Sequence, residues 1–289
     1  MRTSGLFETT RFHKVIKSLK EKLYICFISD VHWLHEGFSH RAWNETKAWD
    51  RENGANTMYF FNGDYLEWAN ARTRHAVAAV VQDSFRAQLD RWVQPDLRQF
   101  AEEARFAIGK TIGVAEGNHG WLFEDGTNDS QVLAGLLQAP FLGVTSVSQI
   151  TLEYHGRCAS FTMNMHHGQP SNGTTSGAPV NAVERMAKHI EGCLIYGQGD
   201  NHQRWAHPMD PKMVPTVNHK TGKLELRHVT PWLVRTGGYV KNFEPGVKSW
   251  LADKGAGARS LGPMILELDP HLGHGPGPAE VTVRSAIYI

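Results

Sequence analysis

Five short apolar runs in this 289-residue chain each end in a cluster of Asp, Asn, His and Gly residues. The clusters, in chain order, are Asp30-Val31-His32, Gly63-Asp64, Gly117-Asn118-His119, His166-His167-Gly168 and Gly199-Asp200-Asn201-His202. A short apolar run that ends in polar residues is typical of a buried strand. In α/β sheets ligands bind beyond the carboxyl ends of the strands, so clusters that are distant in the sequence can converge there. The sequence therefore predicts an α/β fold with one shared polar site.

Strand and helix patterns alternate through the first half of the chain. Apolar residues at helical spacing predict helices over 10–22 and 71–93, Ser39 is a reasonable N-cap for a helix to about residue 50, and Pro95 opens a further helix to about residue 106. The strands expected between them cover 23–29, 57–61 and 111–115. This alternation favours layers of helices and sheet.

The second half is richer in strand patterns. We expect a hairpin of strands 150–154 and 158–165, a loop over 168–179, a helix over 180–190, and strands at 193–196, 224–229, 264–268 and 281–287. No linker or internal repeat divides the chain. We therefore expect a single domain over 1–289, with its core motifs in 23–208 and a β-rich completion in 209–289.

Composition narrows the class of protein and its compartment. With 41% apolar and 20% charged residues the chain is globular, and a net charge of +1 gives no long-range attraction to nucleic acid or to an anionic membrane. Three scattered cysteines suit a reducing compartment, and neither a membrane span nor a signal peptide is expected. We expect a cytoplasmic protein without a membrane partner.

The residue types of the five clusters point to divalent metal ions. Carboxylates, imidazoles and a carboxamide, with no thiolate among them, form an oxygen and nitrogen ligand set. Two ions need about eight ligand bonds, and a bridging carboxylate lets seven residues supply them. Taken singly, Asp30 and Asp64 could instead be helix N-caps, and Asp200 a turn or second-shell carboxylate.

The order of the clusters resembles the calcineurin-like metallophosphoesterase superfamily. That pattern is DxH, GD, GNH followed by an acid, a later His often before Gly, and GHxH, and the resemblance spans residues 30–202. Further similarity, through Thr236-Gly237-Gly238, Lys241, Gly246 and Leu261-Gly262-Pro263, resembles the tail of phage and prophage members. The resemblance implies a four-layered α/β/β/α sandwich of two mixed sheets.

The resemblance also implies a role for each site residue. Asp30, His32 and His202 would bind one metal ion, Asn118, His167 and Asp200 the other, and Asp64 would bridge the two. His119 matches the unliganded catalytic histidine, which stabilises phosphoryl charge or protonates the leaving oxygen. Two such ions would acidify a shared water into hydroxide and hold the phosphate for in-line attack.

Two positions depart from the superfamily pattern. Asp200 replaces an imidazole, which favours harder ions, so Mn²⁺ is expected first, with Mg²⁺, Fe, Ni and Zn²⁺ open. Gly120 replaces the acid that orients the catalytic histidine, and Glu124 or Asp125 could supply that acid from the next turn.

The two adjacent histidines, His166 and His167, compete for one ligand position. Because adjacent strand residues point to opposite faces, only one of them is expected to reach the metal ions. We favour His167, which precedes Gly168, with His166 as a second-shell residue.

These features together predict a phosphoric ester hydrolase of EC class 3.1. The expected reaction is hydrolysis of a phosphodiester, with nucleic acid or a nucleotide as candidate substrate, and the oligomeric state is open. The alternatives are a phosphomonoesterase, a degenerate relative that binds metal or nucleotide without turnover, and a metallohydrolase that uses the same ions on an amide or lactone carbonyl.

Overall fold

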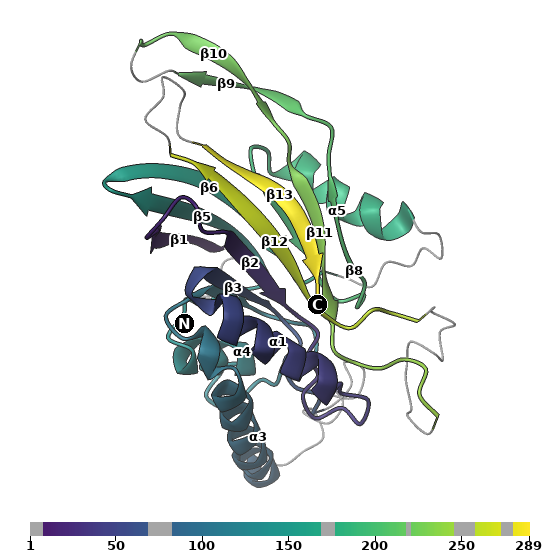
Figure 1. Ribbon diagram of the computed structural model, residues 1–289. Coiled ribbons are helices and arrows are strands. Elements are labelled where there is room, and N and C mark those ends of the chain that lie inside the picture. The colour runs from purple at the N-terminus through teal and green to yellow at the C-terminus, as the bar shows by residue number, and fades with distance from the viewer. Residues whose placement is uncertain (1–7, 69–82, 169–176, 218–220, 246–257, 273–279) are drawn as a thin grey trace.

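The computed structural model describes residues 8–68, 83–168, 177–217, 221–245, 258–272 and 280–289 (Figure 1). Its helices are α1 (His40–Asn53), α3 (Asp83–Glu103), α4 (Asp129–Leu136) and α5 (Gly177–His189), with 3₁₀ turns at Gly54–Asn56 and Arg105–Ala107. Its strands are β1 (Glu8–Val15), β2 (Leu23–Ile28), β3 (Thr57–Asn62), β4 (Thr111–Ala115), β5 (Thr145–Tyr154), β6 (Arg157–His166), β7 (Ile195–Gln198), β8 (Arg204–Pro208), β9 (Lys212–Val217), β10 (Leu224–Val229), β11 (Trp232–Gly238), β12 (Gly262–His271) and β13 (Glu280–Tyr288).

Two mixed sheets share one corner. Within the described residues the strand order runs β1-β5-β6-β7-β11-β12-β2-β3-β4, with β8 beside β11 and β13 beside β12. Strands β11 and β12 join through only two residue pairs, at Gly237 and Gly238, so we treat the strands before this joint as the first sheet and those after it as the second. β6, β7 and β11 are parallel in the first sheet, as are β2, β3 and β4 in the second.

An apolar core lies between the two sheets. Phe27 of β2 and Phe60 of β3 belong to the same buried cluster as Met163 of β6 and Ile195 of β7, and all four side chains are fully excluded from solvent. Residues of both sheets thus face one another in a single core. Burial of apolar area on this scale is the main force that holds two sheets together.

Helices cover the two outer faces (Figure 1). Trp43 of α1 and Phe100 of α3 pack in one cluster with Phe61 of the second sheet, while Val183 of α5 packs with Tyr196 of the first. The layers are therefore helix, sheet, sheet and helix. This confirms the predicted four-layered α/β/β/α sandwich of two mixed sheets.

The predicted helix over 10–22 is wrong, because residues 8–15 form the edge strand β1. They pair in parallel with 146–153 of β5, and alternate residues are half-buried and exposed. The apolar residues that suggested a helix do not share one face, since Val15 and Leu19 are exposed while Ile16 is buried. Pairing with a strand about 140 residues away outweighed the local spacing.

The predicted break at Pro95 is also wrong, because α3 continues through it. Val93, Leu97 and Phe100 are fully buried on both sides of the proline and form one apolar stripe. A proline removes one helical hydrogen bond, and burial of this continuous stripe offsets that loss. The part of the predicted 71–93 helix before residue 83 lies outside the described residues.

The remaining predicted elements lie close to their expected places. Helix α1 begins after Ser39, whose side chain accepts from the Ala42 backbone amide as an N-cap does. The predicted loop over 168–179 falls mostly outside the described residues, and α5 begins at Gly177. Among the helices that the structure describes, none is long and apolar enough to cross a membrane.

Candidate metal centre

The five polar clusters meet where parallel strands of both sheets end. Backbone hydrogen bonds tie the loops together: the Val31 amide donates to the Asp64 carbonyl at 2.8 Å, and the Gly199 amide donates to the His167 carbonyl at 2.7 Å. A third bond runs from the Tyr239 amide to the Asp30 carbonyl at 3.0 Å. The residue that follows β11 is therefore bonded to the loop that follows β2, next to the corner where the two sheets join.

Strained backbone is concentrated in these loops. Seven non-glycine residues of the described chain have positive φ, and five of them are site candidates: Asp30, His32, Asp64, Asp200 and His202, with φ between 46° and 64°. This conformation is uncommon for residues with a Cβ and costs about 1–3 kcal/mol at each position. The fold maintains it where it directs polar side chains inward.

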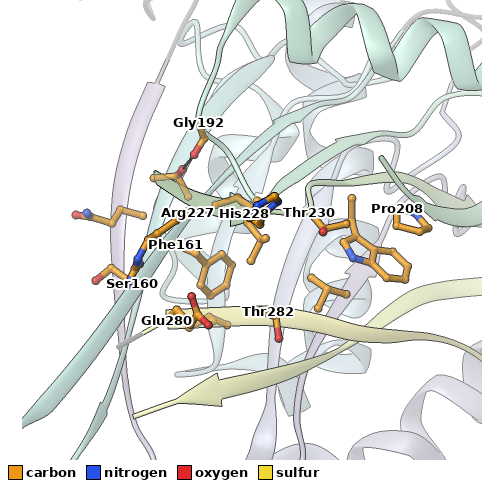
Figure 2. A pocket seen from close by; sticks show the side chains of 16 residues that line it. Ser160, Phe161, Gly192, Pro208, Arg227, His228, Thr230, Glu280 and Thr282 are labelled. Carbon is orange, nitrogen blue, oxygen red and sulfur yellow. Dashed lines mark hydrogen bonds between the residues drawn. The ribbon is translucent and has the colours of Figure 1, made fainter. Parts of the chain in front are cut away.

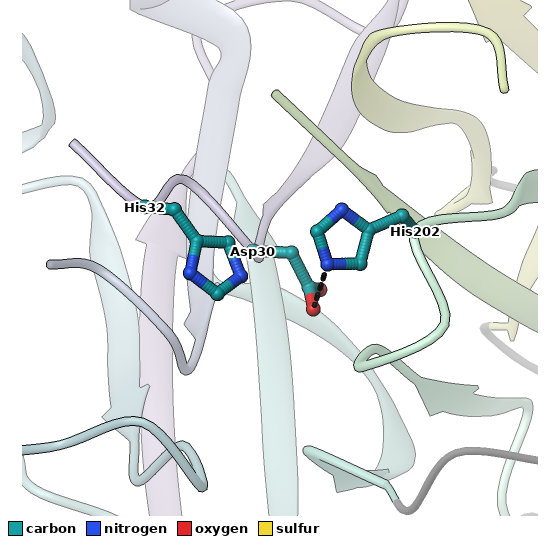
Figure 3. Close-up of side chains that lie close together, drawn as sticks. All are labelled: Asp30, His32 and His202. Carbon is teal, nitrogen blue, oxygen red and sulfur yellow. Dashed lines mark ion pairs between the residues drawn. The ribbon is translucent and has the colours of Figure 1, made fainter. Parts of the chain in front are cut away.

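The first group of ligand atoms comes from Asp30, His32 and His202 (Figure 3). One ligand atom of each lies within 4.8 Å of the other two, and all three residues are at most 2% exposed. The two imidazole rings stack with centroids 5.1 Å apart, and His202 Nε2 lies 3.6 Å from Asp30 Oδ1. Nitrogen and carboxylate oxygen donors thus surround one small volume.

The second group comes from Asp64, His167, Asp200 and Asn118. His167 Nε2 lies 3.1 Å from Asp64 Oδ2 and 3.9 Å from Asp200 Oδ1. Asn118 Nδ2 donates to Asp200 Oδ1 at 2.5 Å, which places the carboxamide beside the carboxylate. Asp64 Oδ2 also lies 3.9 Å from His32 Nε2 of the first group. Asp64 Oδ2 therefore lies between the two groups, and Asp30 lies beside it, since Asp30 also forms a cluster with Asp64 and His167.

Several buried ligand atoms have no hydrogen bond. Asp30 Oδ1, Asp200 Oδ2 and His32 Nε2 are excluded from solvent without a hydrogen-bond partner. Leaving such atoms unsatisfied costs about 1–3 kcal/mol each, and more when they are charged. Lone pairs that converge without hydrogen-bond donors can be satisfied by a cation. The residues of this site therefore fit a bound metal ion.

The opposite ring nitrogens are occupied, which orients the imidazoles. His32 Nδ1 contacts Glu67 Oε2 at 2.5 Å, and His167 Nδ1 donates to the Asn62 carbonyl at 2.6 Å. A hydrogen bond at one nitrogen sets the tautomer and directs the other nitrogen toward a metal. Gly63, at φ +94°, leaves room for the His167 ring, because a Cβ there would collide with Nδ1.

The buried carboxylates make the centre strongly anionic. Burial raises the pKa of Asp30 to about 7, and Asp64 and Asp200 add to that rise against the opposing effect of His167. Burial opposes a charged His167, yet Asp64, Asp30 and Asp200 raise its pKa to about 10. Burial likewise raises the pKa of Asp200. Bound cations would replace the protons that this cluster otherwise retains.

Glu67 is the functional residue that sequence reasoning missed. Its Oε2 contacts His32 and also forms an ion pair of 3.3 Å with His119 Nδ1. Burial opposes its ionisation, but the two imidazoles lower its pKa to about 2, so it stays charged. The acid was sought next to His119, whereas it follows Asp64 by three residues in the preceding motif.

The two acids proposed from sequence to orient His119 have other roles. Asp125 Oδ1 accepts from the backbone and side chain of Thr127, which closes a turn. Glu124 is exposed, and the carboxylate that pairs with His119 is that of Glu67. Glu67 therefore corrects the prediction that Glu124 or Asp125 supplies the acid. Burial opposes protonation of His119, but Glu67, followed by Asp64, raises its pKa overall.

Packing explains the glycine at position 120. A Cβ at Gly120 would lie 2.7 Å from Oδ1 of Asp129, a carboxylate that is 2% exposed at the start of α4. The side-chain space of residue 120 is therefore already filled by another acid. The absence of an acid there reflects this packing.

His166 does not belong to the two groups of ligand atoms. It is the last residue of β6, its backbone carbonyl accepts from Asn62 Nδ2 at 3.3 Å, and its ring is half-buried. Burial, followed by the charges of His167 and Arg235, lowers its pKa. Of the two adjacent histidines, His167 is the one whose ring lies among the carboxylates.

Comparison with known proteins finds similar solved structures at low sequence identity. No family profile and no curated protein matches the sequence. Among solved structures, a calcineurin-like phosphoesterase YfkN from Bacillus subtilis is similar over 92% of this chain and 89% of its own, at 13% identity and a TM-score of 0.42. A putative 5′-nucleotidase from Staphylococcus aureus is similar over 92% and 53%, at 11% identity and a TM-score of 0.41.

A third similar structure is the NAD nucleotidase of Haemophilus influenzae, at 12% identity and a TM-score of 0.39. The likeness covers 92% of this chain and 49% of that protein. This chain thus spans about half the length of the two nucleotidases.

Proposed function

We propose that this protein is a dinuclear, divalent-metal-dependent phosphodiesterase. The observation that carries the proposal is the position of Asp64 Oδ2, 3.1 Å from His167 Nε2 and 3.9 Å from His32 Nε2, between two groups of buried ligand atoms. Asp30, His32 and His202 would hold one ion, and Asn118, His167 and Asp200 the other, with Asp64 shared. When bound, two such ions acidify a water and neutralise charge on the phosphate oxygens.

His119 would act as the general acid of this reaction. Its backbone amide donates to Asp64 Oδ1 at 2.9 Å, which fixes the loop against the centre, and its ring lies 5.0 Å from that of His32. The negative charge of Glu67 raises the pKa of the His119 imidazole against the effect of burial and so favours the protonated ring. A protonated imidazole at this place can donate to the leaving oxygen.

Charge balance favours a diester over a monoester. Two divalent ions together with the carboxylates of Asp30, Asp64 and Asp200 leave one positive charge before the attacking hydroxide is counted, which is one less than with a neutral imidazole at position 200. A phosphodiester carries one negative charge, whereas a monoester carries nearly two at neutral pH. The carboxylate of Asp200, where the superfamily pattern has a neutral imidazole, therefore shifts the preference toward the diester. Its hard oxygen also favours Mn²⁺.

A metal-by-substrate screen on EDTA-stripped protein tests this function. With Mn²⁺ restored we expect hydrolysis of bis-p-nitrophenyl phosphate to exceed that of p-nitrophenyl phosphate. Asp64→Asn should lose this activity, and His119→Ala should lower it by about 10²–10⁴-fold, the usual contribution of a general acid, to a residual rate that can still be measured. The control variants His207→Ala and Asp210→Asn, at exposed positions, should retain full activity. Binding of two ions without hydrolysis of any phosphate ester would favour the non-catalytic alternative, and hydrolysis of carboxylic esters alone would favour the carbonyl hydrolase.

A further inference from the structure

A cavity of about 520 Å³ is lined by residues that do not belong to the metal centre. Figure 2 shows its lining side chains, among them Phe161, Arg227 and Glu280. Leu194 and Trp232, where β7 and β11 begin, line it, whereas the metal-centre loops follow the ends of β6 and β7. Leu194 and Asp200 lie beyond opposite ends of β7, whose four residues span roughly 13 Å at about 3.3 Å per residue. The cavity is thus distinct from the metal centre.

The floor of the cavity is apolar and continuous with the core between the sheets. Phe161, Leu194 and Val281 line it and belong to that buried cluster, and Val229 and Trp232 pack against the cluster. The volume falls in the range of about 300–1,000 Å³ that is typical of small-molecule sites. The apolar part of a small-molecule ligand could therefore pack against this floor.

The wall formed by β10 carries an uncompensated cation. Arg227 Nη2 is excluded from solvent and has no hydrogen-bond partner, and no ion pair of Arg227 is found among the described residues. A guanidinium nitrogen in this position is unsatisfied, and a charge-assisted bond from an anion would satisfy it. Arg227 and the apolar Val229 are two residues apart on one strand, so they share a face.

Glu280 limits the negative charge that a ligand can carry into the cavity. It lines the same cavity from the start of β13, yet it lies farther than 4.0 Å from the Arg227 guanidinium, since the two form no ion pair. Among the described residues no carboxylate is therefore ion-paired with Arg227, and a second negative charge on a ligand would face the Glu280 carboxylate. This combination selects one anionic group.

We propose that this cavity binds an amphipathic monoanion. Its apolar body would lie on Phe161 and Trp232, and its single carboxylate or sulfonate group would accept from Arg227. The proposal is independent of the hydrolase activity, because none of the cavity residues belongs to the metal centre.

Calorimetric titration of the full-length protein with three eight-carbon compounds tests the proposal. Octanoate should bind, octan-1-ol should bind at least about tenfold more weakly because it lacks the anion, and octyl phosphate, a dianion at pH 8, should also bind more weakly. Arg227→Gln should weaken octanoate binding about tenfold or more, the range expected for one charge-assisted bond. Arg11→Gln, on the exposed side of edge strand β1, makes the same charge change and should bind octanoate as the wild type does.

A second variant separates loss of the site from loss of the fold. Val229→Trp fills the cavity and leaves Arg227 in place, so it should also lose octanoate binding. Circular dichroism and the Tm of each ligand-free variant are compared with those of the wild type, and the metal-dependent activity should remain in both. Equal affinity for octanoate and octan-1-ol, or unchanged octanoate binding in a folded Arg227→Gln or Val229→Trp variant, would overturn the proposal.

Discussion

Replacing Glu67 by Gln should change the properties of both imidazoles that this carboxylate contacts, those of His32 and His119. The change keeps the size of the side chain but removes its charge from His32 Nδ1, at 2.5 Å, and from His119 Nδ1, at 3.3 Å. We expect two effects: weaker metal binding through His32, and a less basic His119.

The contacts of Glu67 indicate how large the loss of metal affinity should be and in which direction the pKa of His119 should change. Loss of an outer partner of a metal-ligating histidine typically lowers metal affinity or activity by about 10–100-fold. Burial opposes protonation of His119, but Glu67 raises the pKa of this imidazole, and the same carboxylate also contacts His32. The pKa of His119 should therefore fall in Glu67→Gln.

The assay is the pH profile of kcat for bis-p-nitrophenyl phosphate at saturating Mn²⁺. If His119 is the acid, kcat falls as pH rises through the pKa of its imidazole, so this decline should begin at a lower pH in Glu67→Gln than in the wild type. Titration with Mn²⁺ at fixed pH measures the contribution through His32 separately.

A double-mutant comparison with His119→Ala supplies the control. In that background Glu67→Gln should still weaken Mn²⁺ binding, but it should no longer move the pH profile. The reasoning is refuted if Glu67→Gln alone stays within twofold of the wild type in kcat and in Mn²⁺ affinity. It is also refuted if the pH shift persists without His119.

Three further changes test other parts of the structure. His167→Ala should reduce the calorimetric stoichiometry from two ions to one, while His166→Ala should keep two; equal losses would contradict the assignment. Burial raises the pKa of Asp129 to about 7 from 3.8, so the folded protein retains a proton that the unfolded chain releases, and stability should fall by roughly 4 kcal/mol as pH rises from about 4 to 7. Asp129→Asn should flatten this decline and raise the Tm at pH 8, and a lower Tm there would count against it. Arg235→Met removes the donors to the Gly199 and Pro179 carbonyls, at 2.9 and 3.1 Å, and should cost roughly 3 kcal/mol in urea unfolding, whereas a change below about 1 kcal/mol would show that water replaces them.

Local sequence carried much of the information about the centre. A strand that is buried on both faces is largely apolar, so a polar cluster marks its end, as Ser29-Asp30 does after β2 and Asn62-Gly63-Asp64 does at the end of β3. The same reasoning applies to Ser39, because an N-cap acts within one turn of its own helix. Such features are readable because their causes lie within a few residues.

Contacts between distant segments decided the rest. Residues 8–15 became strand β1 because β5 offered them a partner, and α3 passed through Pro95 because the core beneath it is continuous. Glu67 was not recognised as the partner of His119 because the two loops meet only after β3 and β4 pair. Residue types and short-range periodicity thus determined which side chains end strands, whereas strand pairing and core packing, whose energies depend on distant partners, decided which of them touch.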